Sequence, residues 1–191
     1  MFICVSCVYH HNFGLYEDKL VCMWNNHKKS ISRIFHYQIQ GTIIYTVNHK
    51  KKVHVRFTWI YNNNNCCMKL FNIFGLTIIS ISIENGVVYI LNGIVYQNAD
   101  FKNEIHKWIV DFSYFLKQSQ QWILGLPGNN VEYKLNSTGC LSYINCCHDD
   151  KNISIYYRNY YSNNIPTLPK VLEACYDQHH IKLVINHWNI R

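Results

Sequence analysis

Two neighbouring segments alternate between apolar and polar residues, and this period of two restricts the fold more than any other feature. In residues 37–47 most odd positions are apolar and the positions between them are mostly polar. Residues 53–61 alternate in the same way, and the polar stretch Asn48–Lys52 separates the two runs. Because successive side chains of a strand point to opposite faces, each run predicts a β-strand with one buried face. Together they predict a hairpin with its turn at Asn48–Lys52.

Short apolar runs separated by turn residues continue along much of the chain. Asn62–Asn65 and the glycines Gly75, Gly86 and Gly93 mark turns between them. Sequential short strands with tight turns predict an antiparallel meander. The further predicted strands are 66–72, 76–84, 86–91, 93–97, 131–135, 140–146, 152–159, 167–175 and 180–188.

Three segments show helical periodicity instead. Between Glu17 and Phe35 apolar residues recur at intervals near three and four. A second helix is predicted from a cap at Asp100 to about Leu116, and a short one over 120–126. Strands on both sides of these helices predict an α+β fold, in which an antiparallel sheet forms a half-closed barrel. Its natural ligand site is the space between the concave face and the helices.

Composition and length restrict the class of protein. A chain of 191 residues with 49% hydrophobic residues fits one globular domain. No stretch approaches the roughly 20 apolar residues of a transmembrane helix. The net charge of +7 raises the possibility of nucleic-acid binding, but the basic residues are scattered and their longest run is Lys50–Lys52. AT-rich codons explain the abundance of Asn, Ile, Lys and Tyr, so we predict no nucleic-acid partner.

The nine cysteines do not have the spacing of a metal site. Cys66–Cys67 and Cys146–Cys147 are adjacent pairs, and neighbouring cysteines rarely ligate one tetrahedral metal. Cys4 and Cys7 form a C-x-x-C that no second such motif accompanies. We predict neither a metal nor any other cofactor.

The sequence also has no nucleophile elbow, phosphate loop or H-E-x-x-H pair. The nearest approach to a catalytic group is His148 with Asp149 and Asp150, in a predicted turn where solvated side chains are the expected state. We therefore predict that the protein is not an enzyme.

Aromatic residues and one apolar turn are the informative positions. Trp59, Trp108 and Trp122 lie on predicted inward faces, where a large ring either fills the core or lines a cavity, the core being the more frequent role. Ile73 and Phe74 stand beside a turn glycine, a place that polar residues usually occupy. They belong either to a loop tucked against the barrel end or to an exposed apolar finger that contacts lipid or a partner.

Several of these segments resemble the LolB family of outer-membrane lipoproteins. The most specific resemblance is Gln121-Trp122-Ile123-Leu124-Gly125-Leu126-Pro127-Gly128, and the similarity extends from about Trp24 to Arg191. The other segments that carry it are Gln38–Gly41, Val55–Trp59, Asn72–Gly75, Glu132–Leu135, Ile165–Pro169 and Ile181–Ile185 with Asn186 and Trp188.

The resemblance implies an open barrel of about eleven antiparallel strands, with helices covering its mouth and a hydrophobic cavity for acyl chains. It implies a monomer that receives acylated lipoproteins from the periplasmic carrier LolA and inserts them into the outer membrane. The membrane-insertion loop would be Ile73, Phe74 and Gly75, with Ile73 in place of the proline usual in the family. We expect the cavity to be lined by Phe57, Trp59, Trp108, Trp122 and Leu126.

The resemblance also implies a lipid anchor. Cys7 precedes Trp24 by 17 residues, a spacing similar to that of the family's lipidated cysteine, although Cys4 stands where leucine is usual. Residues 1–16 would then be a signal remnant and tether, and residues 17–191 a single lipoprotein-binding domain on the periplasmic face of the outer membrane. A periplasmic fatty-acid or lipid-binding module without an anchor is the alternative, and it would share the cavity.

Overall fold

The computed structural model describes residues 6–48, 50–63, 65–85, 87–92, 113–129, 131–148, 151–162 and 165–190, of which 6–17, 51–52, 91–92, 113–117, 148 and 151 are described by their backbone alone. Within these ranges ten strands form one antiparallel sheet in the order β5-β4-β3-β2-β1-β10-β9-β8-β7-β6. Two helices accompany it. The elements are α1 (Ser6–Ile31), β1 (His36–Val47), β2 (Lys50–Asn62), β3 (Asn65–Phe71), β4 (Thr77–Glu84), β5 (Val87–Asn92), α3 (Ser113–Leu124), β6 (Glu132–Leu135), β7 (Leu141–His148), β8 (Lys151–Tyr161), β9 (Leu168–Tyr176) and β10 (His179–Ile190).

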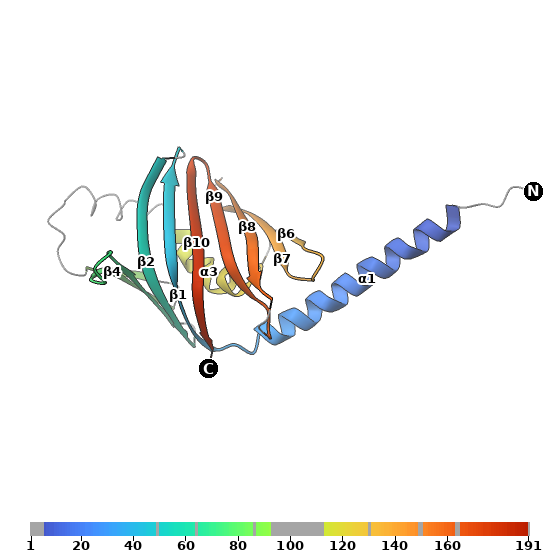
Figure 1. Cartoon of the computed structure of the whole chain (residues 1–191), viewed down its shortest axis with the longest axis horizontal. Coiled ribbons are helices and arrows are strands. Elements are labelled where there is room, and N and C mark those ends of the chain that lie inside the picture. Colours follow the sequence, from blue (N-terminus) through green and yellow to red (C-terminus); the bar gives the residue numbers. More distant parts are fainter. Residues whose placement is uncertain are drawn as a thin grey trace, which may run out of the picture.

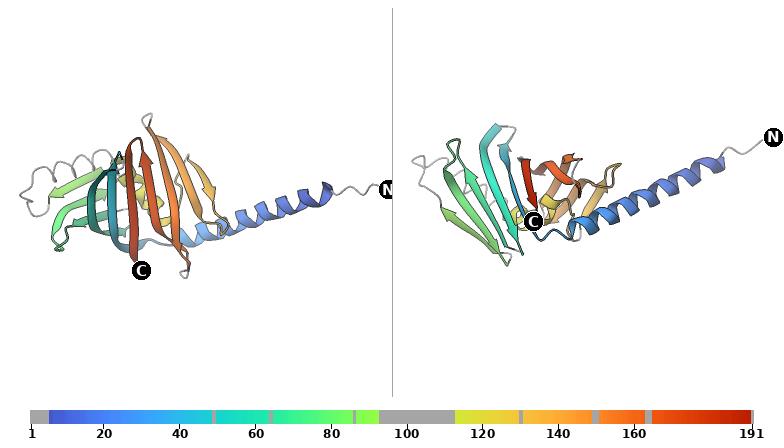
Figure 2. Two further views of the ribbon diagram at one scale, coloured as in Figure 1. Left: turned by 45° about the horizontal axis from the view of Figure 1, so that its top comes forward. Right: turned by 60° about the horizontal axis from the view of Figure 1, so that its bottom comes forward.

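The sheet is strongly curved and is not closed (Figure 1). Its first and last long strands, β1 and β10, pair at the centre, which leaves β5 and β6 at the two edges. Helix α3 lies on the concave side, whereas α1 projects away from the sheet (Figure 2). The expectation that helices cover the mouth therefore holds for α3 and not for α1.

The predicted hairpin is confirmed as β1 and β2, which pair from His36↔Asn62 to Val47↔Lys50. The burial follows the predicted alternation, since Ile39, Ile43, Val55 and Phe57 are buried. The predicted turn was too long, because Lys50–Lys52 belong to β2. Asn48 adopts the left-handed conformation, with φ of 48°, so the chain reverses within fewer residues.

Both described helices differ from their predicted bounds. Helix α1 begins at Ser6 and ends at Ile31, so Phe35 lies beyond it and is 60% exposed instead of completing an apolar stripe. The described part of helix α3, Ser113–Leu124, includes most of the short helix predicted over 120–126 and the last residues of the helix predicted from Asp100. The predicted strand 93–97, most of the helix predicted from Asp100, and Trp108 lie outside the described residues.

The remaining predicted strands match β3 to β10 within a few residues at each end. Their inward faces form one apolar cluster with α3 and with Trp24, Ile31 and Ile34 at the end of α1 and just beyond it. The core is therefore the concave side of a single sheet, covered in part by one helix.

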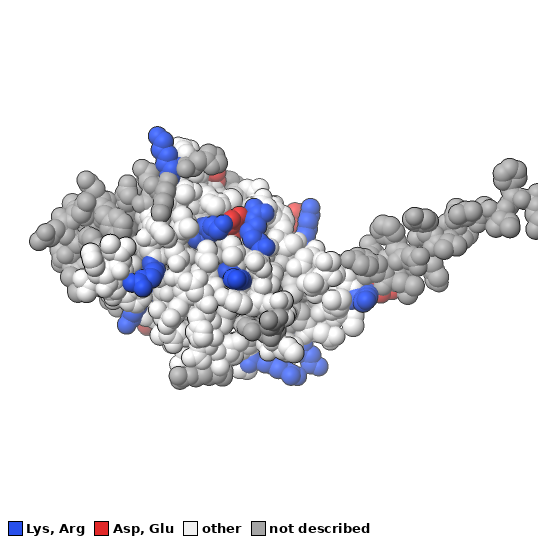
Figure 3. Space-filling view, viewed as in Figure 1, with Lys and Arg blue, Asp and Glu red and all other residues white. Residues whose placement is uncertain are grey.

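The convex face carries dispersed Lys and Arg side chains (Figure 3). Glu173 on β9 accepts from Arg158 Nε at 2.6 Å and from Lys182 Nζ at 3.1 Å. Partial burial raises the pKa of Glu173, but the hydrogen bonds and charges of Arg158 and Lys182 outweigh it and leave the pKa below its usual value. This network links β8, β9 and β10 on the face opposite α3.

Candidate functional site

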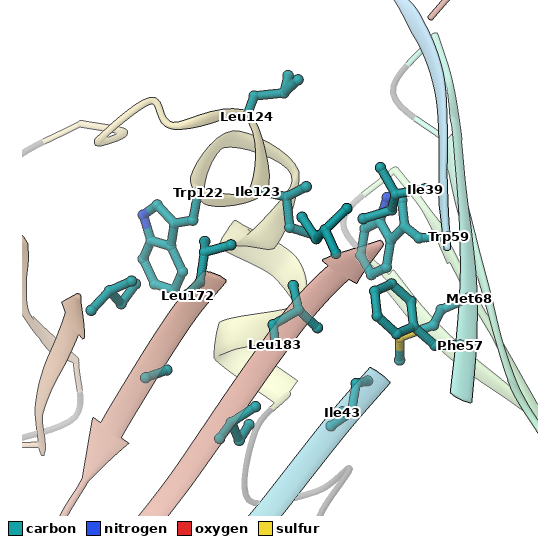
Figure 4. Packing of buried hydrophobic residues seen from close by; sticks show 14 of the residues in the cluster. Ile39, Ile43, Phe57, Trp59, Met68, Trp122, Ile123, Leu124, Leu172 and Leu183 are labelled. Atoms are coloured by element: carbon teal, nitrogen blue, oxygen red, sulfur yellow. The ribbon is translucent and has the colours of Figure 1, made fainter. Parts of the chain in front are cut away.

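The concave side of the sheet presents apolar side chains that converge on α3. Figure 4 shows Trp122 and Ile123 of α3 facing Leu172 and Leu183 of the sheet, with Trp59 close by. Each of these five side chains is at most 5% exposed. Phe57, Met68, Ile39 and Ile43 extend the same layer across β1, β2 and β3.

The chain after α3 ends the helix with a defined hydrogen-bond pattern. Gly125 has φ of 80°, a left-handed conformation that glycine adopts without strain. Its N–H donates to the Trp122 carbonyl at 3.0 Å, and the Leu126 N–H donates to the Gln121 carbonyl at 2.9 Å. This pair of bonds is the Schellman motif, which satisfies carbonyls that the helix end leaves free. The Gln121–Gly128 segment, which carries the most specific family resemblance, thus contains the C-terminal cap of α3.

Two further hydrogen bonds attach this helix end to its surroundings. Trp122 Nε1 donates to the Pro127 carbonyl at 3.0 Å, which folds the following loop back over the indole. The buried Tyr157 hydroxyl of β8 donates to the Trp122 carbonyl at 2.8 Å. The carboxyl end of α3 is therefore fixed to the sheet at β8.

The residues expected to line a cavity come together in this layer. Phe57, Trp59 and Trp122 belong to one buried cluster, and Leu126 is partly buried against it. Trp108 lies outside the described residues. At Phe57, Trp59 and Trp122 the structure has close-packed core, with exposures of 2%, 2% and 1%, so an open cavity at these positions is not confirmed.

A few polar groups lie within the apolar layer near the middle of α3. The Tyr37 hydroxyl donates to the Gln120 carbonyl at 3.4 Å. Burial raises the pKa of the Cys66 thiol to about 12 although a hydrogen bond with Gln120 opposes this, and burial raises the pKa of Tyr37 well above its usual value. These groups are therefore neutral at physiological pH, and the buried residues that the structure describes include no Lys, Arg, Asp or Glu.

A pocket of about 450 Å³ opens at the ends of β1, β2 and β10. Tyr37 borders both this pocket and the interior layer. Tyr37 and Tyr61 pair across β1 and β2, and their rings stack with centroids 5.1 Å apart. The other lining residues are His36, Gln38, Ile60, Asn62 and Asn189.

The turn between β3 and β4 exposes two large apolar side chains. Ile73 is 80% exposed and Phe74 is 79% exposed, so the alternative of a loop tucked against the barrel end is wrong. The buried Asn72 side chain holds the turn, because its Oδ1 accepts from the backbone N–H groups of Phe74 and Leu76, both at 2.9 Å. Arg56 Nη2 donates to the Ile73 carbonyl at 3.2 Å and adds a further attachment to β2.

A second turn, Asn136–Cys140 between β6 and β7, has the same hydrogen bonds. Asn136 Oδ1 accepts from the N–H groups of Thr138 and Cys140, both at 3.0 Å. In both turns the first and last residues bond through the backbone, and a glycine of positive φ stands fourth. The second turn carries Ser137 and Thr138 where the first carries Ile73 and Phe74. The backbone geometry therefore does not require apolar residues at these positions.

Sequence reasoning missed the residues that hold these features. Tyr157 and Arg56 each act through one hydrogen bond to a backbone atom and the carboxamide of Asn72 through two, and such bonds leave no periodic signal. The shared N-x-x-G spacing of the two turns was the available signal, because Asn favours such side-chain-to-backbone bonds and Gly the positive φ.

Other predicted positions are only partly described. The backbone of Cys7 lies in the first turn of α1. His148 ends β7, and Asp149 and Asp150 lie outside the described residues. Among the side chains that the structure describes, no three His, Cys, Asp or Glu residues are grouped so as to hold a metal ion. In the same part of the chain no helix has the length and apolar character needed to span a bilayer.

The chain is similar to proteins of one family. The family described as "Outer membrane lipoprotein LolB" matches residues 35–188. An outer-membrane lipoprotein LolB of Sodalis glossinidius is 28% identical over 188 residues, covering 97% of this chain and 90% of the relative. One of Baumannia cicadellinicola is 29% identical over 177 residues, covering 91% and 81%. A LolA superfamily protein of Nitrosomonas europaea, solved by crystallography, superposes with a TM-score of 0.48 at 8% identity, covering 90% of this chain and 93% of that one.

Proposed function

Because the chain belongs to the LolB family, we propose that it is a lipid-anchored receptor that takes acylated lipoproteins from the carrier LolA and inserts them into the outer membrane. The receptor would act on the periplasmic face of that membrane and without catalysis. The observation that carries the insertion step is the turn Asn72–Leu76, which holds Ile73 and Phe74 in solvent although an equivalent turn carries serine and threonine.

The apolar layer between α3 and the sheet supports the acceptor role. Each exposed methylene of an acyl chain costs about 0.8 kcal/mol in water, so a carrier must shelter the chains. The described interior is apolar and free of charged side chains, as such a ligand requires. Since Phe57, Trp59 and Trp122 are packed in this structure, we infer that acyl chains enter when α3 moves away from β2. The bond from Tyr157 to Trp122 would keep the carboxyl end of the helix in place as a hinge.

Transfer without nucleotide requires only that each site binds more tightly than the one before. A ligand then moves from LolA to the receptor and on to the bilayer down a series of free energies. The exposed ring of Phe74 would enter the lipid first and shorten the aqueous gap that the chains must cross.

The anchor proposal concerns Cys7 and α1. Trp24 follows Cys7 by 17 positions, and in a helix this corresponds to about 25 Å. Trp24 is one of the residues that attach α1 to the body, since its Nε1 donates to the Tyr133 hydroxyl at 3.2 Å. A lipid on Cys7 would thus hold the body at a fixed helical distance from the membrane.

Phe74→Glu tests the insertion turn. We expect this variant to retain binding of a LolA-delivered lipoprotein while losing at least about nine-tenths of its transfer into liposomes, because a charge cannot enter the apolar part of a bilayer without a large desolvation cost. Transfer is measured as the fraction of lipoprotein that floats with the liposomes.

The matched control is Ser137→Glu, which adds the same charge to the tip of the equivalent turn. It should transfer lipoprotein as the wild type does. Normal transfer by Phe74→Glu would remove the turn from the mechanism. Recovery of the protein in the soluble periplasmic fraction, with binding but no delivery, would favour the lipid-binding module without an anchor.

A further inference from the structure

The indole N–H of Trp59 is a buried hydrogen-bond donor with no partner in the part of the chain that the structure describes. Its side chain is 2% exposed, so bulk water does not supply one. A buried donor without an acceptor destabilises a folded protein, so this group in a native structure calls for an acceptor from outside the chain or for another explanation.

The neighbouring polar groups do not satisfy this donor. The indole lies near the Tyr37 hydroxyl and lowers its pKa, against the larger effect of burial, but the two groups do not reach hydrogen-bond geometry. Tyr37 instead donates to the Gln120 carbonyl at a long 3.4 Å. Gln120 lowers the pKa of the Cys66 thiol, against the larger effect of burial. Trp59 Nε1–H therefore has no acceptor among the described residues, although it lies inside the apolar layer close to neutral polar groups of Tyr37, Gln120 and Cys66.

We propose that Trp59 Nε1–H donates a hydrogen bond to an ester carbonyl of the acylated cargo. This inference rests on the proposed function and specifies which part of the lipid is recognised. An ester carbonyl is a neutral acceptor with no donor of its own, which fits a site that offers one spare N–H and no charge. A free fatty acid would bring a carboxylate, and no described buried side chain could pair with it.

The position of Trp59 suits an amphiphilic ligand. Trp59 pairs with Ile39, and two residues further along the same strands Tyr37 pairs with Tyr61 at the pocket of about 450 Å³. The polar end of a lipid would lie toward this pocket, and its chain would lie along the apolar face formed by Phe57, Met68 and Ile43.

The test compares two probes that differ in one carbonyl, 1-palmitoylglycerol and its ether analogue 1-O-hexadecylglycerol, by calorimetric titration of the full chain. We expect the wild type to bind the ester about tenfold more tightly than the ether. Trp59→Phe keeps an aromatic ring but removes the N–H, so it should bind both probes equally.

Trp188→Phe is the matched control, since this indole already donates to the Pro169 carbonyl at 3.0 Å. It should lower the midpoint of unfolding and leave the preference for the ester unchanged. Equal binding of the two probes by the wild type would overturn the inference and leave the acyl site standing. A preference retained by Trp59→Phe would overturn it in the same way, whereas binding of neither probe would overturn the acyl-binding interior itself.

Discussion

Asn72 and Asn136 make the same side-chain-to-backbone hydrogen bonds in two turns, one with apolar and one with polar residues at its tip. Each carboxamide oxygen accepts two backbone N–H groups and so shapes a five-residue connection between antiparallel strands. In the first turn the residues held in place are apolar and exposed, in the second they are polar. Conformation and surface chemistry are therefore set by different residues, and each can be changed without the other.

Asn72→Ala should loosen the insertion turn while the sheet stays folded. The substitution removes the acceptor of two hydrogen bonds, each with a net contribution of about 1 kcal/mol, and solvent beside the turn can replace part of the loss. We expect the backbone amides of Phe74 and Leu76 to exchange with deuterium about ten times faster, with an unchanged rate in β1 and β10. Asn136→Ala should accelerate deuterium exchange at the amides of Thr138 and Cys140 in the same way and leave Phe74 and Leu76 unchanged. Unchanged exchange at Phe74 in the first variant would show that the carboxamide does not hold this turn.

At single positions the sequence indicated the apolar or polar character of a site better than it indicated how tightly the side chains pack there. An apolar pair beside a turn glycine marked Ile73 and Phe74 but left open whether the turn is tucked or exposed, and the structure exposes both side chains. The same reasoning could not decide whether Trp59 and Trp122 line a cavity, because periodicity reports the direction of a side chain and not the volume beside it. The unpaired indole of Trp59 depends on the orientation of one ring and has no trace in the sequence.

Among the elements, the strands were predicted more accurately than the helices. The period of two in residues 37–47 and 53–61 is visible because one face of each strand is buried and the other is solvated. Helix α1 leaves most of its described surface exposed, so its apolar spacing marks only the end that packs at Trp24 and Ile31. The helical residues before Glu17 therefore had no such pattern to reveal them.

The irregularity at the centre of the sheet depends on Gly41. The register of β1 and β10 shifts between Gln40 and Gly41, a β-bulge that increases local bending. A Cβ atom at Gly41 would overlap the Val184 carbonyl oxygen and approach Phe57 Cε1 to 2.8 Å. The Gln38–Gly41 segment is thus a place where two strands come unusually close.

Gly41→Ala should destabilise the protein by roughly 3 kcal/mol, because the added methyl group forces a backbone shift between the two central strands. The measurement is the midpoint of urea unfolding at constant slope. Thr42→Ala, one residue further along β1, shortens a half-buried side chain and should change the free energy of unfolding by less than half as much. A Gly41→Ala protein as stable as the wild type would mean that β10 can move away without cost.

On the scale of the whole molecule, helix α1 packs on the body near its carboxyl end, in part against the β6–β7 hairpin. Trp24 lies against Tyr133 with ring centroids 5.7 Å apart, and a Cβ at Gly139 would come within 2.7 Å of Met23 Cβ. The β6–β7 hairpin is thus the surface on which this part of the helix packs, and we call this contact the seat of α1. If Cys7 carries the anchor, as proposed, the strength of this seat decides how firmly the body is held relative to the membrane.

His27 makes this seat sensitive to acid. Its ring stacks on Trp24 with centroids 6.0 Å apart, its Nε2 is buried, and burial lowers the pKa below the ordinary value of 6.5. Lys28, whose Nζ lies 5.2 Å from the Trp24 ring centroid, is a positive charge next to it. The unfolded chain therefore takes up a proton at His27 more readily than the folded one, so the stability from a neutral His27 is complete above pH 6.5 and falls as the pH drops through the lowered pKa.

Lowering the pH from 7.5 to 5 should therefore reduce the free energy of unfolding of the wild type more than that of His27→Phe, which keeps a ring on Trp24 but cannot be protonated. The other histidines and the carboxylates titrate in both proteins, so the difference between the two pH profiles isolates His27. The protection factors of the amides in the Asn136–Cys140 turn, which correct for the slower intrinsic exchange at low pH, should fall at pH 5 in the wild type only, because protonation weakens the contact that Met23 and Trp24 make there. Parallel pH profiles for the two proteins would place the acid sensitivity elsewhere and leave the seat of α1 independent of pH.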